Sequence, residues 1–452
     1  MDALTEKYNR PGPRYTSYPT AVEFDDRVEK KAYAGALREA AKSVDDPWSV
    51  YVHIPFCEKR CTFCACAVIS TSQHDRVAPA YVKALKQELA LTRALTRGRD
   101  TVAQLHLGGG TPTYLAPELL DELLAELFRE FEVLSDAELS AEVDPRVTSE
   151  AHLDVLARYG FNRLSMGVQD LDAKVQGAIG RHQSLDDTMR LMERAQARGL
   201  EAFNVDLIYG LPYQTEEGLR RTVQAMIEAG IGRAAVYGYA HVPWMRGHQK
   251  RLPLAALPKG RRRLRLAEVV RECFEYAGYR AIGLDHFALP DDELALAADD
   301  GRLMRNFMGY TVRGGSDMLG LGLSSIGDVG GSYVQNSTKL VRYLDACEAG
   351  QFAVVRGRAR TRDDEIRRAV IDAWMCHGEV VREQISARFD MSFDAYFEEE
   401  LQALQELIDD HIVIDDGERL ILHPEAGPFV RNVAMVFDAY MGETRGRFSK
   451  TV

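Results

Sequence analysis

The sequence lacks the features that would place the protein in a membrane or on a charged polymer. No run of eighteen apolar residues occurs in the 452-residue chain, so we expect no transmembrane helix and no membrane insertion. The first residues lack the apolar core of a secretory signal, and we therefore expect a cytoplasmic protein whose thiols stay reduced. The formal net charge of −12 disfavours nucleic acid as a main partner, because phosphate binding requires a basic surface.

Cysteine is also scarce, with 7 residues in the whole chain. Four of them nevertheless lie within ten residues, between Cys57 and Cys66. A disulfide framework would need an oxidising compartment, for which the chain carries no signal. Thiols at this spacing are typical of a zinc site or of an iron–sulfur cluster.

Cys57, Cys61 and Cys64 form a C-x3-C-x2-C triplet. A structural zinc site normally closes four ligands, often as two C-x2-C pairs, and no second pair follows in this chain. His53 and Cys66 would have to complete a zinc tetrahedron, which is the alternative. The triplet favours a 4Fe–4S cluster with three protein ligands, so that the fourth iron is open to a ligand that is not protein.

Short apolar runs alternate with helix-period segments from residue 48 onward, which predicts repeated βα units around a parallel sheet. The expected strands are residues 49–54, 104–107, 139–143, 163–168, 202–208 and 234–239. The helices expected after them are residues 80–95, 117–131, 149–159, 185–197, 216–228 and 262–275. About six units predict an α/β fold with an incomplete parallel β/α barrel.

Polar or glycine-rich residues follow each expected strand. In chain order these are the cysteine loop, residues 108–113, Glu142 with Asp144, Gln169 with Asp170, Asp206, and His241. Taken alone, each of them could be a helix cap, part of a turn, or a core residue whose polar atoms are hydrogen-bonded. Because the carboxyl ends of parallel strands share the face that carries active sites, their common position favours a functional site around the cysteines.

The two ends of the chain differ from its middle. Residues 1–35 hold prolines and aromatic residues that predict an extended arm, and residues 36–350 hold the barrel with an extension. Within 351–452 we expect helices at 365–377 and 393–409, then a hairpin formed by 412–414 and 420–422, which predicts a mostly helical, winged-helix-like domain. This domain has 13 Lys and Arg against 20 Asp and Glu, which favours a structural or lid role over DNA binding.

A glycine-rich segment lies between these parts. Residues 309–331 hold eight glycines, but no dinucleotide-binding motif or P-loop follows a strand there. We expect this segment to allow close approach of the backbone to a ligand.

Motifs along almost the whole chain resemble those of radical S-adenosylmethionine (SAM) enzymes and, among them, the oxygen-independent coproporphyrinogen III oxidase family. The motifs are Gly12-Pro-Arg14-Tyr-Thr-Ser-Tyr-Pro-Thr20, Tyr51-Val-His-Ile-Pro-Phe-Cys57, Gly108-Gly-Gly-Thr-Pro-Thr-Tyr114, Glu142-Val-Asp-Pro-Arg146, Asp206-Leu-Ile-Tyr-Gly-Leu-Pro212 and Asp285-His-Phe-Ala-Leu-Pro. The resemblance implies that Cys57, Cys61 and Cys64 hold a 4Fe–4S cluster, that SAM binds its fourth iron, and that cleavage of SAM yields a 5'-deoxyadenosyl radical. It also implies a second SAM molecule beside the first.

The resemblance further assigns cofactor contacts residue by residue. They are Tyr51, Phe63, Gly109, Gly110, Thr111, Glu142, Gln169, Arg181, Asp206, Ala240 and Ile326. Their chemistry suits the task, since carboxylates pair an ammonium or sulfonium, an arginine pairs a carboxylate, and glycines admit close backbone donors.

The implied reaction converts two propionates of coproporphyrinogen III into vinyl groups and gives protoporphyrinogen IX for haem biosynthesis. Arg14 and the basic run 259–265 are candidate anchors for the four carboxylates, and the arm and C-terminal domain would shield the radical. Cys66 is the candidate catalytic residue, with a ligand or packing role as alternatives. We expect a monomer; the sequence identifies neither the electron donor nor the electron acceptor.

Some positions depart from the family pattern. Ala65 and Ala67 replace the usual Gly and Asn on either side of Cys66, Thr62 replaces an aromatic residue, and Met308 replaces a Gln that the family associates with the second SAM. A thioether cannot donate a hydrogen bond as an amide does. A related tetrapyrrole-modifying enzyme such as a methyltransferase is therefore the first alternative, and a haem chaperone of the same superfamily is the second.

Overall fold

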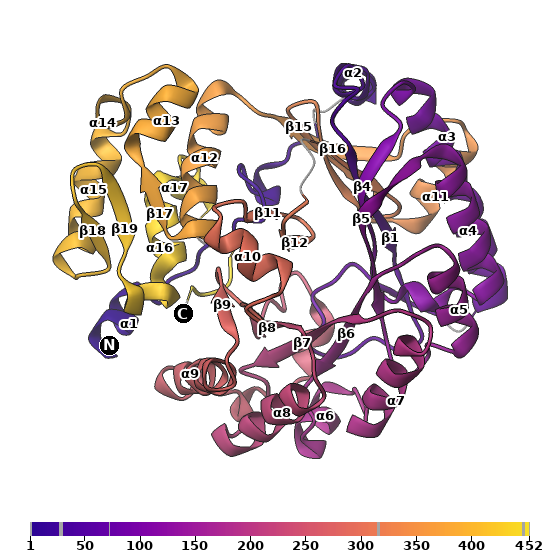
Figure 1. Cartoon of the computed structure of the whole chain (residues 1–452), viewed down its shortest axis with the longest axis horizontal. Coiled ribbons are helices and arrows are strands. Elements are labelled where there is room, and N and C mark those ends of the chain that lie inside the picture. The colour runs from indigo at the N-terminus through magenta and orange to yellow at the C-terminus, as the bar shows by residue number, and fades with distance from the viewer. Residues whose placement is uncertain (1, 27–29, 72, 314–316, 445–447, 452) are drawn as a thin grey trace.

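The computed structural model describes residues 2–26, 30–71, 73–313, 317–444 and 448–451. Within these residues, one large mixed sheet has twelve strands in the order β16-β15-β14-β13-β1-β4-β5-β6-β7-β8-β10-β9. Figure 1 shows this curved sheet with helices along its outer side and the C-terminal elements across from them. The protein therefore has an α/β fold built on a large sheet flanked by helices.

The centre of the sheet consists of parallel strands in chain order. They are β1 (Trp48–Ile54), β4 (Thr101–Gly109), β5 (Glu132–Val143), β6 (Arg163–Gln169), β7 (Ala202–Tyr209) and β8 (Arg233–Gly238). Helices follow them as α3 (His74–Thr96), α4 (Pro117–Glu130), α5 (Glu150–Arg158), α6 (Ala173–Ile179), α7 (Leu185–Gln196), α8 (Glu216–Glu228) and α9 (Arg261–Tyr276). Each expected strand and helix coincides with an observed one, although β4, β5 and α3 are longer than expected, and α6 was not expected.

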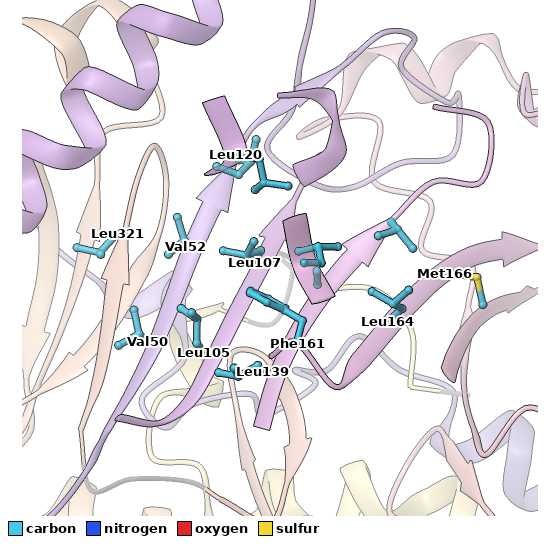
Figure 2. Close-up of a cluster of buried hydrophobic side chains, with 14 of the residues drawn as sticks. Val50, Val52, Leu105, Leu107, Leu120, Leu139, Phe161, Leu164, Met166 and Leu321 are labelled. Atoms are coloured by element: carbon cyan, nitrogen blue, oxygen red, sulfur yellow. The ribbon is translucent and has the colours of Figure 1, made fainter. Parts of the chain in front are cut away.

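Alternation along these strands separates a core face from a polar face. Buried aliphatic residues on β1, β4, β5 and β6 pack against the helix layer beside Leu120 of α4 (Figure 2): Val50, Val52, Leu105, Leu107, Leu139, Leu164 and Met166. Because successive side chains of a strand point to opposite faces, the residues between them face the inside of the curved sheet. Those residues include Tyr51, His106, Glu142, Ser165 and Asp206. The core pattern thus gathers polar groups on the inner face.

The helix starts show why these segments are helical. Ser149 and Ser184 cap α5 and α7 in reciprocal capping boxes, and the Thr215 side chain accepts from the Gly218 N–H at the start of α8. Gly180 follows α6 at φ 68°, a left-handed conformation that favours glycine.

Further strands extend the sheet at both ends. Next to β1 lies the parallel strand β13 (Met318–Leu321), followed by the antiparallel strands β14 (Ile326–Val329), β15 (Ser332–Asn336) and β16 (Val354–Ala359). Beyond β8 lie β10 (His286–Ala288) and β9 (Arg280–Ile282). The other elements of this region are β2 (Phe56–Cys57), β3 (Ile69–Ser70), α10 (Glu293–Asp299), β11 (Met304–Asn306), β12 (Gly309–Thr311) and α11 (Leu340–Glu348).

Several glycines of the segment 317–331 approach the protein's own backbone. A Cβ at Gly320 would collide with the Ile326 carbonyl, and one at Gly322 would lie 2.6 Å from the His53 carbonyl oxygen. Gly322 has φ +99° and donates its N–H to buried Glu88 at 2.8 Å. Close packing against the protein's own backbone explains glycine at these two positions, and approach of the segment to a ligand stays a prediction. Gly314 and Gly315 lie outside the described residues.

The C-terminal part combines helices with a small antiparallel sheet in the order β17-β19-β18. Its elements are α12 (Arg362–His377), β17 (Glu379–Val381), α13 (Arg382–Phe389), α14 (Phe393–Tyr396), α15 (Glu398–Asp409), β18 (Val413–Asp415), β19 (Arg419–Leu422), α16 (Val430–Ala434) and α17 (Met441–Thr444). The expected hairpin is present. The expected single helix 393–409 is interrupted at Phe397, whose ψ of 28° departs from helical geometry and whose ring is fully buried.

The N-terminal segment is extended only in its middle. It begins with α1 (Asp2–Tyr8), contains a 3-10 turn at Ala21–Glu23, and enters α2 (Lys30–Ala40) before the expected boundary at residue 35. The prolines that predicted an extended arm are confined to residues 11–19, so they leave both flanks free to form helices. The division of the chain into 1–35, 36–350 and 351–452 stays a prediction.

The arm, here residues 9–20, packs on the C-terminal part. Tyr15 and Tyr18 belong to its hydrophobic core, and Pro11 forms a β-bridge with Lys450. Buried Arg431 donates to the carbonyl oxygens of Gly12 and Pro13. Among the described helices, none combines the length and the apolar composition that a bilayer crossing requires.

Candidate active site

A cavity of about 520 Å³ lies on the inner face of the sheet, where the parallel strands end. Most of the residues expected to form a site line it, namely Cys57, Cys61, Phe63, Cys64, Cys66, Gly109, Gly110, Thr111, Glu142, Gln169, Arg181 and Asp206. Tyr51, Ala240 and Ile326 are not among the described lining residues. Segments distant in the sequence thus meet in one cavity.

The cysteine loop is fixed from one side by α6 and the second strand end. Cys57 ends the short strand β2, and its Sγ lies 3.6 Å from the Thr111 Oγ1. Thr62, which departs from the family pattern, donates its N–H and its hydroxyl to the carbonyl oxygens of Ile179 and Ala178. A small hydroxyl residue at this position ties the loop to the end of α6.

A second segment fixes the loop from the other side. His248 Nε2 lies 2.8 Å from the Cys64 carbonyl oxygen, and Arg246 Nε donates to the Ala65 carbonyl at 2.7 Å. The fully buried Gln249 donates to the carbonyl oxygens of both Phe63 (2.8 Å) and Ala240 (3.2 Å). Gln249 therefore links the backbone of Ala240 to Phe63, which lines the cavity. Sequence reasoning missed these three side chains, because polar residues in a loop have no periodicity that marks them.

The thiols differ in their environments. Burial raises the pKa of Cys57 to about 11, which a bound metal would reverse by favouring the thiolate. A hydrogen bond from Cys66 lowers the pKa of Cys64, and the same contact raises the pKa of Cys66. Cys66 is exposed to the cavity, whereas Cys61 is buried.

The side chains around His53 disfavour the zinc alternative. Its Nδ1 lies 2.9 Å from the Tyr51 hydroxyl and its Nε2 lies 3.1 Å from the Ala67 carbonyl oxygen, so both ring nitrogens have partners. Cys57, Cys61, Cys64 and Cys66 all line one cavity.

Two carboxyl groups on the inner face have opposite tendencies. Burial acts to raise the pKa of Glu142, but hydrogen bonds from His106 and from the Gly109 N–H (2.9 Å) outweigh it and keep the carboxylate ionised. Burial and the neighbouring Glu142 charge raise the pKa of Asp206 to about 7. Asp206 is thus partly protonated near neutral pH, so it can donate a hydrogen bond, while Glu142 supplies negative charge.

Basic groups lie at the next strand end. Arg181 donates to the Asp144 carboxylate at 3.2 Å and to the Gln183 side chain at 2.9 Å, while its Nε is buried without a partner in the described structure. Asp144 also binds Arg146 in a bidentate pair. Gln169 has φ 68°, a conformation uncommon for residues other than glycine and concentrated at functional sites. The lining therefore offers an anionic and a cationic region side by side.

Several lining residues were not expected. Arg146 lies beside Cys61, and it could have been found as the last residue of the Glu142 to Arg146 motif. Tyr237, near the end of β8, also lines the cavity. It was missed because an aromatic residue in a buried strand is usually part of the hydrophobic core.

Comparisons with known proteins agree with this geometry. The family model of the radical SAM superfamily matches residues 51–226. Oxygen-independent coproporphyrinogen III oxidase from Pseudomonas aeruginosa is 40% identical over 452 residues, which cover 99% of this chain and 98% of the relative. The chain belongs to the oxygen-independent coproporphyrinogen III oxidases. The enzyme of that name from Escherichia coli K12 is 42% identical over 439 residues and covers 97% of this chain and 95% of its own.

A solved structure supports the same family. Coproporphyrinogen III oxidase from Escherichia coli, described as a radical SAM enzyme, superposes with a TM-score of 0.91 at 40% identity and covers 97% of this chain and 98% of its own. Membership implies a 4Fe–4S cluster and SAM. The residues present fit both groups, since three thiols, an ionised carboxylate and an arginine with an unpartnered buried nitrogen share the cavity.

Substitution of Cys66 by serine should separate catalysis from cluster binding. We expect Cys66→Ser to keep full iron content but to lower vinyl formation by about 100-fold, the scale of a lost proton-transfer group. The reason is that Cys66 is exposed to the cavity, where a thiol can transfer a proton and the much less acidic hydroxyl of serine cannot do so as readily. Iron analysis and product chromatography measure the two effects. Unaltered turnover would dismiss a catalytic role, and loss of iron would make Cys66 a ligand.

Proposed function

We propose that this enzyme carries out the oxygen-independent oxidative decarboxylation of coproporphyrinogen III to protoporphyrinogen IX in haem biosynthesis. Each of two propionates loses a hydrogen from its β-carbon, one electron and carbon dioxide, and a vinyl group remains. The observation that carries this proposal is the cavity in which three cysteines meet Glu142, Arg181 and Asp206, in a chain that aligns over nearly its full length with oxidases of this name.

The chain's own residues have distinct parts in this proposal. Cys57, Cys61 and Cys64 hold the cluster through their thiolates. When bound, the cluster and SAM supply a one-electron reduction that produces the 5'-deoxyadenosyl radical as the hydrogen-abstracting species. Ionised Glu142 attracts a cationic group, and the free Nε of Arg181 can bind a carboxylate.

The remaining cofactor contacts support binding and orientation. The partly protonated Asp206 donates to a hydroxyl, and Phe63, Thr111 and Gln169 shape the walls. Gly110 has no room for a Cβ beside Phe56, so its backbone stays close to the cysteine loop. Tyr51 stacks on His106 behind Glu142, so it supports the cavity from outside its lining.

Arg14 is the proposed anchor for a substrate carboxylate. One of its nitrogens pairs with Asp285, and its guanidinium lies 5.4 Å from the ring centre of Tyr237, which lines the cavity. In the basic run 259–265, Arg265 pairs with Glu216, Glu268 and Glu272 and so points to the surface. Arg263, over the ring of Tyr209, is the candidate in that run.

Finer features are part of the same proposal. The parallel strands β1 and β4 to β8 with their helices are proposed to form an incomplete barrel of six βα units, and α12 to β19 a winged-helix-like domain. Two SAM molecules are proposed, with Ile326 near the second. We further propose a cytoplasmic monomer with a separate electron donor and electron acceptor. Met308, which motivated the methyltransferase alternative, is not among the described lining residues of the cavity.

An anaerobic assay tests the function. Protein with reconstituted cluster, dithionite, SAM and coproporphyrinogen III should yield protoporphyrinogen IX, two molecules of carbon dioxide per tetrapyrrole, methionine and 5'-deoxyadenosine. Release of methionine and 5'-deoxyadenosine without a vinyl product would refute the substrate assignment. A methylated tetrapyrrole as product would favour the methyltransferase instead.

A further inference from the structure

Residues 241–265 have a charge that is unusual for this chain. The whole protein has a net charge of −12, yet this segment holds eight Lys and Arg residues and no Asp or Glu. Within it, Trp244 and Met245 are 61% and 59% exposed. Exposed Trp and Met beside basic residues are typical of protein interfaces, where Trp, Met and Arg are enriched.

The exposed side chains lie next to the cysteine loop. Trp244 and Met245 are followed in the chain by Arg246 and His248. These two side chains form hydrogen bonds with the carbonyl oxygens of Ala65 and Cys64. Lys250 and Arg251 come next, on the 3-10 turn Gly247–Arg251, and are also exposed. We call Trp244, Met245, Lys250 and Arg251 the 244–251 surface.

The 244–251 surface is separate from the cavity. Among the described residues that line the cavity, none belongs to 241–251. The cavity and the 244–251 surface thus share no described residue. The position of this surface offers a route to the cysteines from outside, through the backbone of residues 63–65.

We infer that the 244–251 surface is the docking site for a small acidic protein that carries one electron. The inference rests on the proposed function, because a 4Fe–4S cluster held by Cys57, Cys61 and Cys64 needs an external electron in each cycle. In the transfer the carrier loses one electron and the cluster gains it, and no covalent bond forms or breaks. Lys250 and Arg251 attract the acidic partner, and Trp244 and Met245 form the apolar centre of the contact.

The size of the surface suits a transient complex. Weak redox complexes bury less than about 1,200 Å² in total, so a few exposed side chains suffice as a centre. Charge attraction raises the rate of encounter and lets the partner leave after one electron has passed.

Trp244 provides a direct measurement of docking. The other two tryptophans of the chain, Trp48 and Trp374, are both described and are 0% and 1% exposed. In protein labelled with 5-fluorotryptophan, ¹⁹F spectra should therefore show Trp244 alone shifting on addition of flavodoxin or a 2Fe–2S ferredoxin as acidic probes. The basic cytochrome c should shift nothing, and Trp244→Phe assigns the resonance.

Charge reversal tests the electron route. With reduced flavodoxin as donor, Lys250→Glu combined with Arg251→Glu should lower both binding and 5'-deoxyadenosine formation at least about tenfold. With dithionite, which reduces without docking, the same variant should match the wild type. Lys31→Glu combined with Arg38→Glu, on exposed positions of α2, makes the same change in charge and should leave both rates unaltered.

The outcomes separate docking from the proposed function. The inference fails if the acidic probes leave the Trp244 resonance unmoved or if the reversed variant binds them as the wild type does. It also fails if the variant forms 5'-deoxyadenosine as slowly with dithionite as with flavodoxin. The segment would then only support the structure of the cysteine loop. A wild type that forms no vinyl product with dithionite contradicts the proposed function, whereas the ¹⁹F titration still decides docking.

Discussion

Replacing Cys61 with serine is expected to abolish vinyl formation, with a fall of more than about 100-fold. Loss of a group that only hydrogen-bonds a metal ligand already costs about 10–100-fold in metal affinity or activity, so loss of a ligand itself should cost more. Cys61 is buried at the base of the cavity beside Arg146, and a serine hydroxyl does not bind iron as a thiolate does. Cys57→Ser and Cys64→Ser should behave alike. Iron and sulfide analysis with visible absorption gives the cluster content of each variant.

The matched control is a cysteine outside the cavity. Cys273 is buried on α9, where Arg220 donates to its sulfur at 3.4 Å. Cys273→Ala should keep the cluster and most of the activity, because its thiol lines no part of the described cavity. A Cys61→Ser protein with a full complement of iron and normal turnover would contradict the ligand assignment.

Asp285→Asn is expected to destabilise the fold by about 3–5 kcal/mol, the scale for breaking one side of a buried ion pair. Its carboxylate is 4% exposed and lies between Arg14 of the arm, His286 at 2.7 Å and Arg305 at 4.0 Å. Arg305 itself is buried, and its Nε and Nη1 have no hydrogen-bond partner in the described structure. Removal of the carboxylate leaves two guanidinium groups without their shared counter-ion.

Denaturation with urea measures this effect, whose size depends on pH. Arg14, His286 and Arg305 outweigh burial and hold the pKa of Asp285 well below its usual value. The contribution of Asp285 to the free energy of unfolding is thus fully present above the pKa of about 3.9 that this residue has in the unfolded chain. It is lost as the pH falls toward the lower pKa of Asp285 in the folded protein. The difference between wild type and variant should be constant from about pH 5 to 8 and shrink in acid.

Asp299→Asn is the surface control for that measurement. Asp299 and Arg280 form an exposed pair, with side chains 51% and 42% accessible, and such pairs contribute about 0–1 kcal/mol. Equal losses of stability in the two variants would show that Asp285 is no more than another surface carboxylate.

The sequence predicted what periodicity and spacing encode. Alternation of aliphatic and polar residues predicted β1 and β4 to β8, and it also decides that Glu142 and Asp206 face inward. The cysteine spacing predicted three thiols in one place, and the cavity gathers them. These features are local or repeat at fixed intervals, so a single chain displays them.

Other features depend on contacts between distant segments. Gln249, His248 and Arg246 hold the cysteine loop from more than 180 positions away, and no pattern marks them. Gly320 and Gly322 pack closely against the backbone of Ile326 and His53, a contact that the glycine-rich sequence alone does not specify. The helical flanks of the arm were missed because prolines within 11–19 dominated the prediction for the whole segment.

The contacts between the two ends of the described chain have a consequence for biosynthesis. Arg10 and Gly12 pair with Thr451 and Ser449, and Arg431 holds the carbonyl oxygens of Gly12 and Pro13. Residues 9–20 of the arm are translated more than 400 codons before these partners. The contacts of the arm with Arg431, Ser449 and Thr451 therefore form only after these residues have been translated.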